Sequence, residues 1–310
     1  MQTVGIHHIT AIVGDPQENV DFYAGVLGLR LVKKTVNFDD PETYHLYFGD
    51  DGGRPGTIMT FFPWINAYQG EIGDGQVGVT VFAIPQQSIS YWEKRLTTLQ
   101  IAYTKTTRFD EVVLQFSDVH GLQLELVERD VSQKNQWAGG VPAQYAIQGF
   151  AGAVLYSADP EETITTLTNT MGLAYVATEG DYTRYVASAT LGNTIDVKMV
   201  TGERGTTGVG TVHHIAWRAA TDAQHIAWQQ HVTQQGHYVT DIKDRNYFNA
   251  LYFREPGRIL FEIATDEPGF AHDESIDTMG EGLMLPPQYE EKRQQLEQSL
   301  PRVMVTYNEV

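Results

Sequence analysis

The chain repeats one short structural pattern four times, and this repeat limits the folds that the chain can adopt. Each copy has the pattern of a strand, a helix and three further strands, and the copies begin near residues 5, 76, 150 and 211. In two copies an Asp-Pro pair, at 15–16 and 159–160, precedes a Gly-Leu pair at the same spacing, at 28–29 and 172–173. An Asp N-cap, a Pro in the first turn and a Gly at the C-terminal cap delimit a helix in both copies.

The repeat also predicts how the chain buries its apolar surface. First strands are predicted at 4–13, 77–84, 150–157 and 211–219, helices near 86–99 and 222–235, and the closing strands of the last copy at 238–243, 247–254 and 258–264. One such unit has an open sheet with an apolar face that it cannot bury alone, so two units must pair. We therefore predict an α+β fold in which paired βαβββ modules form cupped barrels around a cavity for a metal or a small ligand.

The length of the chain suggests how the four modules are grouped. At about 150 residues per domain, 310 residues predict two domains. We expect an N-terminal domain of two modules over 1–135, a C-terminal domain of two modules over 148–270, and a tail over 271–310. The charged segment from Pro287 to Leu300 predicts a helix in this tail.

The composition excludes several classes of function. The chain has 21 Lys and Arg against 39 Asp and Glu, for a net charge of −18, which argues against nucleic acid and against an anionic membrane surface as partners. It has no cysteine, which excludes disulfides, thiolate metal sites and a cysteine nucleophile. The first residues lack the features of a signal peptide, so we expect a cytoplasmic protein. The sequence allows a homo-oligomer.

Two histidine pairs occupy the same place in two copies of the repeat. His7-His8 lies in the first strand of copy one, and His213-His214 lies in the first strand of copy four. Neighbouring residues of a strand face opposite sides, so one histidine of each pair faces the cavity unless a bulge turns both inward. The simpler alternative is that these are structural histidines at strand edges, but their recurrence at equivalent places favours a shared site.

A carboxylate in the last strand of copy four completes a candidate metal site. Glu262 lies in an otherwise apolar strand, where an unpaired charge is costly. Together with one histidine of each pair it gives two His and one carboxylate, a set that leaves three metal positions open and typically holds Fe(II). Zn(II) or Mn(II) fits the same ligands. The alternative is a structural ion pair between Glu262 and Arg245, Arg254 or Arg258.

These motifs resemble those of a known superfamily over essentially the whole chain. The resemblance rests on Gly5–Thr10, Phe22-Tyr23 with Leu27–Leu29, Val212–Ala216, Leu251–Gly257, Leu260–Asp266, Gly269-Phe270 and Leu285–Glu290. They resemble the vicinal oxygen chelate (glyoxalase, bleomycin resistance and extradiol dioxygenase) superfamily. The two His-His motifs and the last segment are most similar to its hydroquinone ring-cleaving dioxygenases, the MhqO/PcpA/LinE-like group.

The resemblance implies a metal site and a pairing of the modules. It implies that the second histidine of each pair is the ligand, so that His8, His214 and Glu262 hold Fe(II). It also implies that module one pairs with module four and module two with module three. Mn(II) is a further candidate for the working metal, and Zn or Ni could occupy the site as purified because they bind such ligands more tightly than Fe(II).

The same resemblance implies which residues surround the substrate. His7 and Thr10 would line or support the pocket. Tyr252 or His213 would take or share the proton of a substrate hydroxyl, and Arg245 would stabilise the developing anion.

The implied function is an Fe(II)-dependent, ring-cleaving dioxygenase that uses O2 and a hydroquinone-type aromatic diol. A hydroquinone, a substituted hydroquinone and a catechol all fit the sequence. One alternative is a glyoxalase-type isomerase or lyase, which would need a second carboxylate. Aligned on the Pro-Gly turns at 55–56 and 256–257, the position for that carboxylate is Phe61. The other alternative is a protein that binds a drug or an aromatic compound without chemistry.

Overall fold

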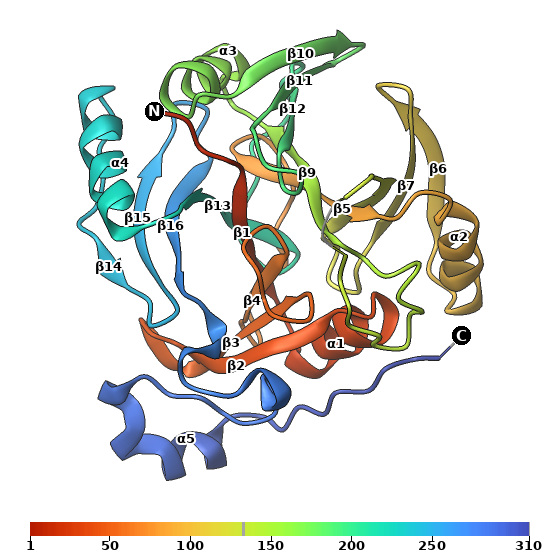
Figure 1. The fold of residues 1–310 in the computed structure, drawn as a ribbon, viewed down its shortest axis with the longest axis vertical. Helices are drawn as coiled ribbons and strands as arrows, with labels where there is room; N and C mark the ends of the chain where they lie inside the picture. The colour runs from red at the N-terminus through yellow and green to blue at the C-terminus, as the bar shows by residue number, and fades with distance from the viewer. Residues whose placement is uncertain (132–133, 310) are drawn as a thin grey trace.

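The computed structural model describes residues 1–131 and 134–309, so the last residue of the predicted tail lies outside the described residues. The chain forms two curved sheets of eight strands each, and the longer helices lie on their outer faces (Figure 1). Each sheet combines two βαβββ modules, as the repeat predicts. The predicted α+β fold is confirmed.

The first sheet combines modules one and four. Its strand order is β14-β15-β16-β13-β1-β4-β3-β2. The strands of module one are β1 (Ile6–Val13), β2 (Arg30–Asn37), β3 (Asp40–Gly49) and β4 (Ile58–Pro63), and those of module four are β13 (Thr211–Ala219), β14 (Lys243–Asp244), β15 (Phe248–Arg254) and β16 (Leu260–Pro268). The two modules join where β1 pairs antiparallel with β13. We refer to the concave side of this sheet as the first cup.

The second sheet combines modules two and three in the same way. Its order is β10-β11-β12-β9-β5-β8-β7-β6, and its central pair is β5 with β9. The strands are β5 (Gln76–Ile84), β6 (Tyr103–Arg108), β7 (Glu111–Ser117), β8 (Gln123–Glu128), β9 (Gly149–Tyr156), β10 (Ala174–Glu179), β11 (Tyr182–Val186) and β12 (Thr194–Lys198). Its concave side is the second cup. The predicted pairing of modules is confirmed, whereas the predicted domain boundaries stay a prediction.

The helices begin where the Asp-Pro pairs predict. Asp15 and Asp159 cap their helices by accepting hydrogen bonds from backbone N–H groups of the first turn. The helices are α1 (Pro16–Val20), α2 (Ile89–Thr98), α3 (Pro160–Thr165) and α4 (Asp222–Gln234). Both α1 and α3 continue into a wider π-helical turn, over Asp21–Val26 and Thr166–Thr170. Gly28 and Gly172 then take the positive φ angles, 70° and 78°, that glycine adopts most easily.

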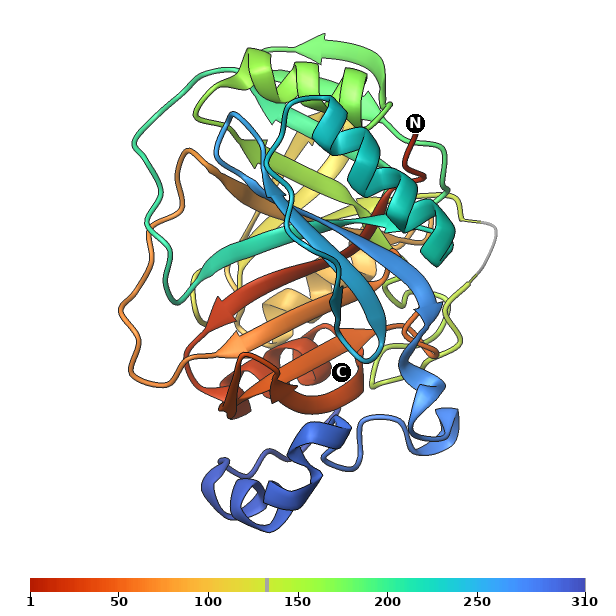
Figure 2. The same ribbon diagram turned by 90° about the vertical axis from the view of Figure 1, so that its left-hand side faces the viewer.

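The C-terminal tail packs against both halves of the molecule. It contains short 3-10 turns at Phe270–His272, Ile276–Thr278 and Pro287–Lys292, followed by α5 (Arg293–Ser299). The predicted helix between Pro287 and Leu300 is thus divided between a 3-10 turn and α5. Figure 2 shows this segment beneath the first sheet. The chain then extends to the second half, where Arg95 donates a hydrogen bond to the backbone oxygen of Asn308.

One predicted strand is much shorter than expected. The segment predicted at 238–243 contributes only Lys243–Asp244 as β14, at the edge of the first sheet. Next to it, Thr240 pairs with Tyr252 once through its backbone N–H and once through its side-chain oxygen. The side chain thus replaces a regular rung of the ladder, and the strand stops.

No helix among the described residues is long and apolar enough to span a membrane. The cytoplasmic location stays a prediction from the sequence.

Candidate metal centre

The two His-His pairs lie side by side at the centre of the first cup. The register between β1 and β13 slips by one residue at His7 and again at His213. Each pair therefore contains a β-bulge, which re-aims side chains that a regular strand would point to opposite faces. As a result the two histidine rings of each pair lie on the same side of the strand and contact each other. From the sequence alone, such a bulge is only an alternative.

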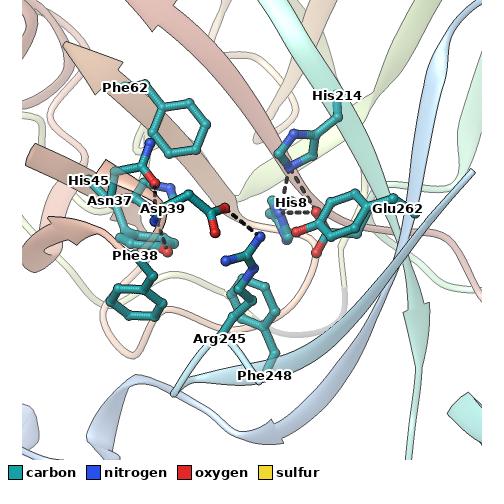
Figure 3. Close-up of a pocket in the computed structure, with 12 residues that line it drawn as sticks. His8, Asn37, Phe38, Asp39, His45, Phe62, His214, Arg245, Phe248 and Glu262 are labelled. Carbon is teal, nitrogen blue, oxygen red and sulfur yellow. Dashed lines mark hydrogen bonds and ion pairs between the residues drawn. The ribbon is translucent and has the colours of Figure 1, made fainter. Parts of the chain in front are cut away.

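Three side chains converge in the cup within the reach of one ion (Figure 3). His8 Nε2 lies 3.3 Å from His214 Nε2 and 3.5 Å from Glu262 Oε2, and His214 Nε2 lies 2.9 Å from the same oxygen. Two ligand atoms that are each about 2.1 Å from one ion and at right angles lie about 3.0 Å apart. All three residues are buried. Their donor atoms therefore fit a single divalent ion with nitrogen and oxygen ligands.

Among the described residues, no Lys or Arg forms an ion pair with the carboxylate of Glu262, which has the two imidazoles beside it. Both of its oxygens are buried, and neither accepts a hydrogen bond of normal geometry. Burial alone would raise its pKa, but the imidazoles of His8 and His214 hold this pKa well below its usual range. Of its predicted arginine partners, Arg245 binds Asp39 and Arg254 donates to the backbone oxygen of Arg258. The structural ion pair with an arginine is therefore wrong, and a buried anion without one favours a bound cation.

The first histidine of each pair supports the second through the same contact. His7 Nδ1 lies 2.9 Å from His8 Nδ1, and His213 Nδ1 lies 2.8 Å from His214 Nδ1. Burial and the neighbouring His8 lower the pKa of His7 well below its usual value. Burial and the neighbouring His214 lower the pKa of His213 to about 3. As neutral acceptors, both can hold the proton of the second histidine on Nδ1, which leaves its Nε2 lone pair directed at the centre.

A cavity of about 40 Å³ adjoins the three residues. It is lined by His8, Asn37, Phe38, Asp39, His45, Tyr47, Phe62, His214, Arg245, Phe248, Tyr252 and Glu262. Such a volume holds about three water molecules. Rings and polar groups alternate in its wall, as in sites for small aromatic molecules.

Two of the predicted pocket residues stand beside Glu262. Tyr252 is its cross-strand neighbour on β15, and the Arg245 guanidinium lies 5.8 Å from the centre of the Tyr252 ring. Burial and the Glu262 carboxylate raise the pKa of Tyr252 well above its usual value, and Arg245 acts in the opposite direction. Tyr252 is therefore a protonated phenol. Arg245, in the turn between β14 and β15, also donates from Nη2 to Asp39 Oδ2 at 2.9 Å.

The other predicted residues lie behind the wall of the cavity. His7 and His213 contact the candidate ligands and do not line the cavity. Thr10 is fully buried, and its Oγ1 lies 2.8 Å from Thr60 Oγ1. Thr60 in turn lies 2.8 Å from Nε2 of His45, a cavity residue that sequence reasoning missed.

The sequence alignment of module one is wrong by one residue. Two residues after His214, Ala216 pairs with Glu262 on β16, and two residues after His8, Thr10 pairs with Thr60 on β4. Thr60 is therefore the equivalent of Glu262 in module one. Phe61, which the Pro-Gly alignment puts there, faces the core, with its ring 4.3 Å from that of Tyr23. The turn before β4 is one residue shorter than the turn before β16, and a one-residue slip exchanges the two faces of a strand. Phe62 therefore lines the cavity. Module one still has no carboxylate at this position.

The family assignment follows from a comparison with known proteins. Residues 5–126 and 149–263 match the family described as the Glyoxalase/Bleomycin resistance protein/Dioxygenase superfamily. The chain belongs to this superfamily. The resemblance that the His-His motifs predict is therefore confirmed.

Individual members of the superfamily are similar over nearly the full chain. A Bacillus subtilis (strain 168) protein named "Putative ring-cleaving dioxygenase MhqO" is 60% identical over 300 residues, with 96% of each chain covered. The chlorohydroquinone/hydroquinone 1,2-dioxygenase of Sphingobium indicum is 34% identical, with 94% of each chain covered. The crystal structure of a Bacillus subtilis protein titled as a putative dioxygenase matches with a TM-score of 0.98 at 59% identity, covering 99% of both chains. Glyoxalase I from Zea mays, at 14% identity, covers 84% of this chain and 92% of its own with a TM-score of 0.63, and shares the fold.

Proposed function

We propose that the chain is an Fe(II)-dependent dioxygenase that cleaves the ring of hydroquinone-type aromatic diols with O2. The observation that carries this proposal is the buried carboxylate of Glu262, which has two imidazole nitrogens beside it and no Lys or Arg ion-pair partner among the described residues. Relatives that are similar over nearly their full length are named ring-cleaving and hydroquinone dioxygenases. The lack of a carboxylate at Thr60 weighs against the isomerase alternative.

His8, His214 and Glu262 would hold the metal. These three ligands suit Fe(II), with Mn(II) as a second candidate and Zn or Ni as ions that a purified sample could carry. When bound, such a metal would lower the pKa of a diol hydroxyl and supply the spin-allowed route by which O2 reacts with the ring. The buried His7 and His213 would keep the two histidine ligands in the tautomer that coordinates through Nε2.

The remaining roles belong to side chains of the cavity. The Tyr252 phenol is our candidate for the group that shares the proton of the substrate hydroxyl, since it lines the cavity next to Glu262. His213, the other candidate from the sequence, is engaged with His214, and we assign it to support. Arg245 would stabilise negative charge on the bound diol. Phe62 and Phe248 would flank the ring, and a ring bound in the buried cup would displace water from the cavity.

Oxygen uptake after anaerobic reconstitution with Fe(II) tests this function. We expect iron-dependent uptake with methylhydroquinone, and a ring-opened acid that contains both atoms of labelled O2. Uptake with catechol alone would retain the dioxygenase and change its substrate class. An iron-loaded protein that takes up no oxygen with either diol would contradict the proposal and favour the isomerase or the binding protein.

A further inference from the structure

The first cup has a second tyrosine at the place that mirrors Tyr252. In module four Tyr252 is the cross-strand partner of Glu262, and in module one Tyr47 is the cross-strand partner of Thr60. Because Thr60 holds the register place of Glu262, Tyr47 corresponds to Tyr252. Both tyrosines line the cavity, one from each module. The candidate metal centre lies at the junction of these modules, so it has a phenol on either side.

A chain of hydrogen bonds holds this second tyrosine. The Tyr47 hydroxyl lies 2.7 Å from His45 Nδ1. His45 Nε2 in turn lies 2.8 Å from Thr60 Oγ1, which is hydrogen-bonded to Thr10 Oγ1. The His45 ring also packs against Tyr47, with 4.0 Å between the ring centres, and against Phe62 at 4.5 Å. The phenol is thus fixed in position by three neighbouring strands.

This chain leaves the Tyr47 hydroxyl with one unused hydrogen-bonding position. Burial lowers the pKa of His45 and raises that of Tyr47, so the imidazole and the phenol are both neutral. A neutral imidazole has one donor and one acceptor nitrogen. If the phenol donates to Nδ1, its oxygen can still accept, and if Nδ1–H donates to the phenol, its proton can still be donated. In either direction the Tyr47 hydroxyl can bind one further polar group.

The position of the pair suits the far end of a diol. Figure 3 shows His45, Asn37 and Asp39 on one side of the cavity and His8, His214 and Glu262 on the other. A diol held at the metal centre by one hydroxyl directs its ring across this narrow cavity. A para hydroxyl then reaches the opposite wall, whereas an ortho hydroxyl stays beside the metal.

We propose that the Tyr47 hydroxyl, positioned by His45, binds the second hydroxyl of a para-diol and thereby makes the site selective for hydroquinones over catechols. This inference rests on the proposed function and names the residue that would set its substrate class. Tyr47 would touch the substrate, and His45 would act through Tyr47.

Removing one hydroxyl from the protein and one from the ligand tests the inference. Binding of hydroquinone and of phenol to the Fe(II)-loaded protein is measured by anaerobic titration calorimetry, so that no turnover is needed. We expect the wild type to bind hydroquinone about 10- to 100-fold more tightly than phenol, the effect of one buried hydrogen bond. In Tyr47→Phe the two ligands should bind alike. A hydroquinone preference that survives in Tyr47→Phe would overturn the inference.

Three further variants separate the positioning role of His45 from a general structural effect. His45→Ala should lose the hydroquinone preference, and His45→Asn, which keeps a polar group near the place of Nδ1, should restore part of it. Tyr44→Phe is the control on the same strand. The Tyr44 hydroxyl donates to the backbone oxygen of Pro301 and does not line the cavity, so this variant should keep the hydroquinone preference. Equal preferences in His45→Ala and the wild type would overturn the role of His45.

The oxygen-uptake experiment separates the two proposals. If the wild type consumes O2 with hydroquinone but Tyr47→Phe keeps the hydroquinone preference, this inference fails and the proposed function stands. If the wild type neither consumes O2 nor binds either ligand, both fail.

Discussion

The two cups are built from the same modules, but different side chains surround their buried carboxylates. In the first cup Glu262 has two histidines beside it, whereas in the second cup Glu125 and Asp196 have Arg108 between them. By strand register, Glu125 on β8 and Asp196 on β12 both hold the place of Glu262 on β16. The fold therefore presents carboxylates at the same point of both cups. We therefore expect a metal only in the first cup, where no Lys or Arg among the described residues pairs with the carboxylate.

In the second cup, protein cations pair with the buried carboxylates. Arg108 donates to Glu125 Oε1 at 2.9 Å and to Asp196 Oδ2 at 2.9 Å, and Arg184 donates to Asp196 as well. By strand register, the residues of this cup that correspond to His8 and His214 are Val79 and Gly152. A Cβ on Gly152 would lie 1.8 Å from the backbone oxygen of Thr194, so no side chain fits there. The second cup thus has buried carboxylates but not the imidazoles of the first cup, and its cavity is only about 10 Å³.

The largest effect is expected from the histidines that distinguish the first cup. His8→Ala and His214→Ala each leave two ligands, too few to hold the metal, so kcat/KM for the diol should fall at least about 1,000-fold. Steady-state oxygen uptake measures this fall. His272→Ala, which changes an exposed histidine, serves as the control and should keep wild-type activity. Wild-type activity in His8→Ala or in His214→Ala would show that the substituted histidine is not a metal ligand.

The second cup should respond in stability instead of activity. Arg108→Ala leaves Glu125 and Asp196 buried with less positive charge, which should cost about 3–5 kcal/mol in the free energy of unfolding. Lys105→Ala on the same strand breaks a more exposed ion pair with Glu93 and should cost no more than about 1 kcal/mol. Urea unfolding compares them. Equal losses in the two variants would show that the Arg108 network does not stabilise the fold.

Within the first cup, the cavity residues should change catalysis without changing metal content. Tyr252→Phe and Arg245→Ala should each lower kcat/KM about 100-fold, because a proton-sharing group or a charge beside the anion is lost. Iron analysis on the same samples should give the wild-type content. Arg254→Ala, an exposed arginine that donates to the backbone oxygen of Arg258, is the matched control. Unchanged kcat/KM in Tyr252→Phe or Arg245→Ala would refute that assignment.

A smaller effect is expected behind the first cup, in the pH dependence of stability. His225 on α4 lies with Nε2 2.7 Å from the backbone oxygen of Ile263, and burial lowers its pKa. Below about pH 6.5 the unfolded chain therefore takes up a proton that the folded chain refuses, so stability falls as the pH falls. His225→Gln keeps a donor to Ile263 and should flatten this slope. Chemical unfolding at several pH values checks it, and an unchanged slope would contradict this role of burial.

Much of the first cup could be predicted because its key residues repeat. The same His-His pair in two equivalent strands, with a lone carboxylate in an apolar strand, indicates one histidine of each pair and Glu262, and the family resemblance selects His8 and His214. Such local patterns survive folding, because strand alternation and the repeat place each side chain without knowledge of its partners. The bulges at His7 and His213 could only be stated as an alternative, since a bulge depends on the register between two strands.

What the sequence could not predict depends on register and turn length. The Pro-Gly alignment puts Phe61 in the cavity because it assumes two turns of equal length. The one-residue difference instead turns Thr60 and Phe62 to the cavity side of β4, and Phe62 lines the cavity. His45 and Tyr47 were missed because β3 reaches the cup through pairing with β4, which no local pattern shows. Their alternation along β3, polar towards the cavity and apolar towards the core, was the signal available.

The most direct test of the account compares one carboxylate from each cup. Iron per chain is measured after anaerobic loading and desalting of Glu262→Gln and Glu125→Gln, together with the unfolding midpoint of the metal-free proteins. We expect almost no iron in Glu262→Gln, and about one iron per chain with a lowered midpoint in Glu125→Gln. Wild-type iron in Glu262→Gln, or loss of iron in a folded Glu125→Gln, would contradict the assignment of the metal to the first cup.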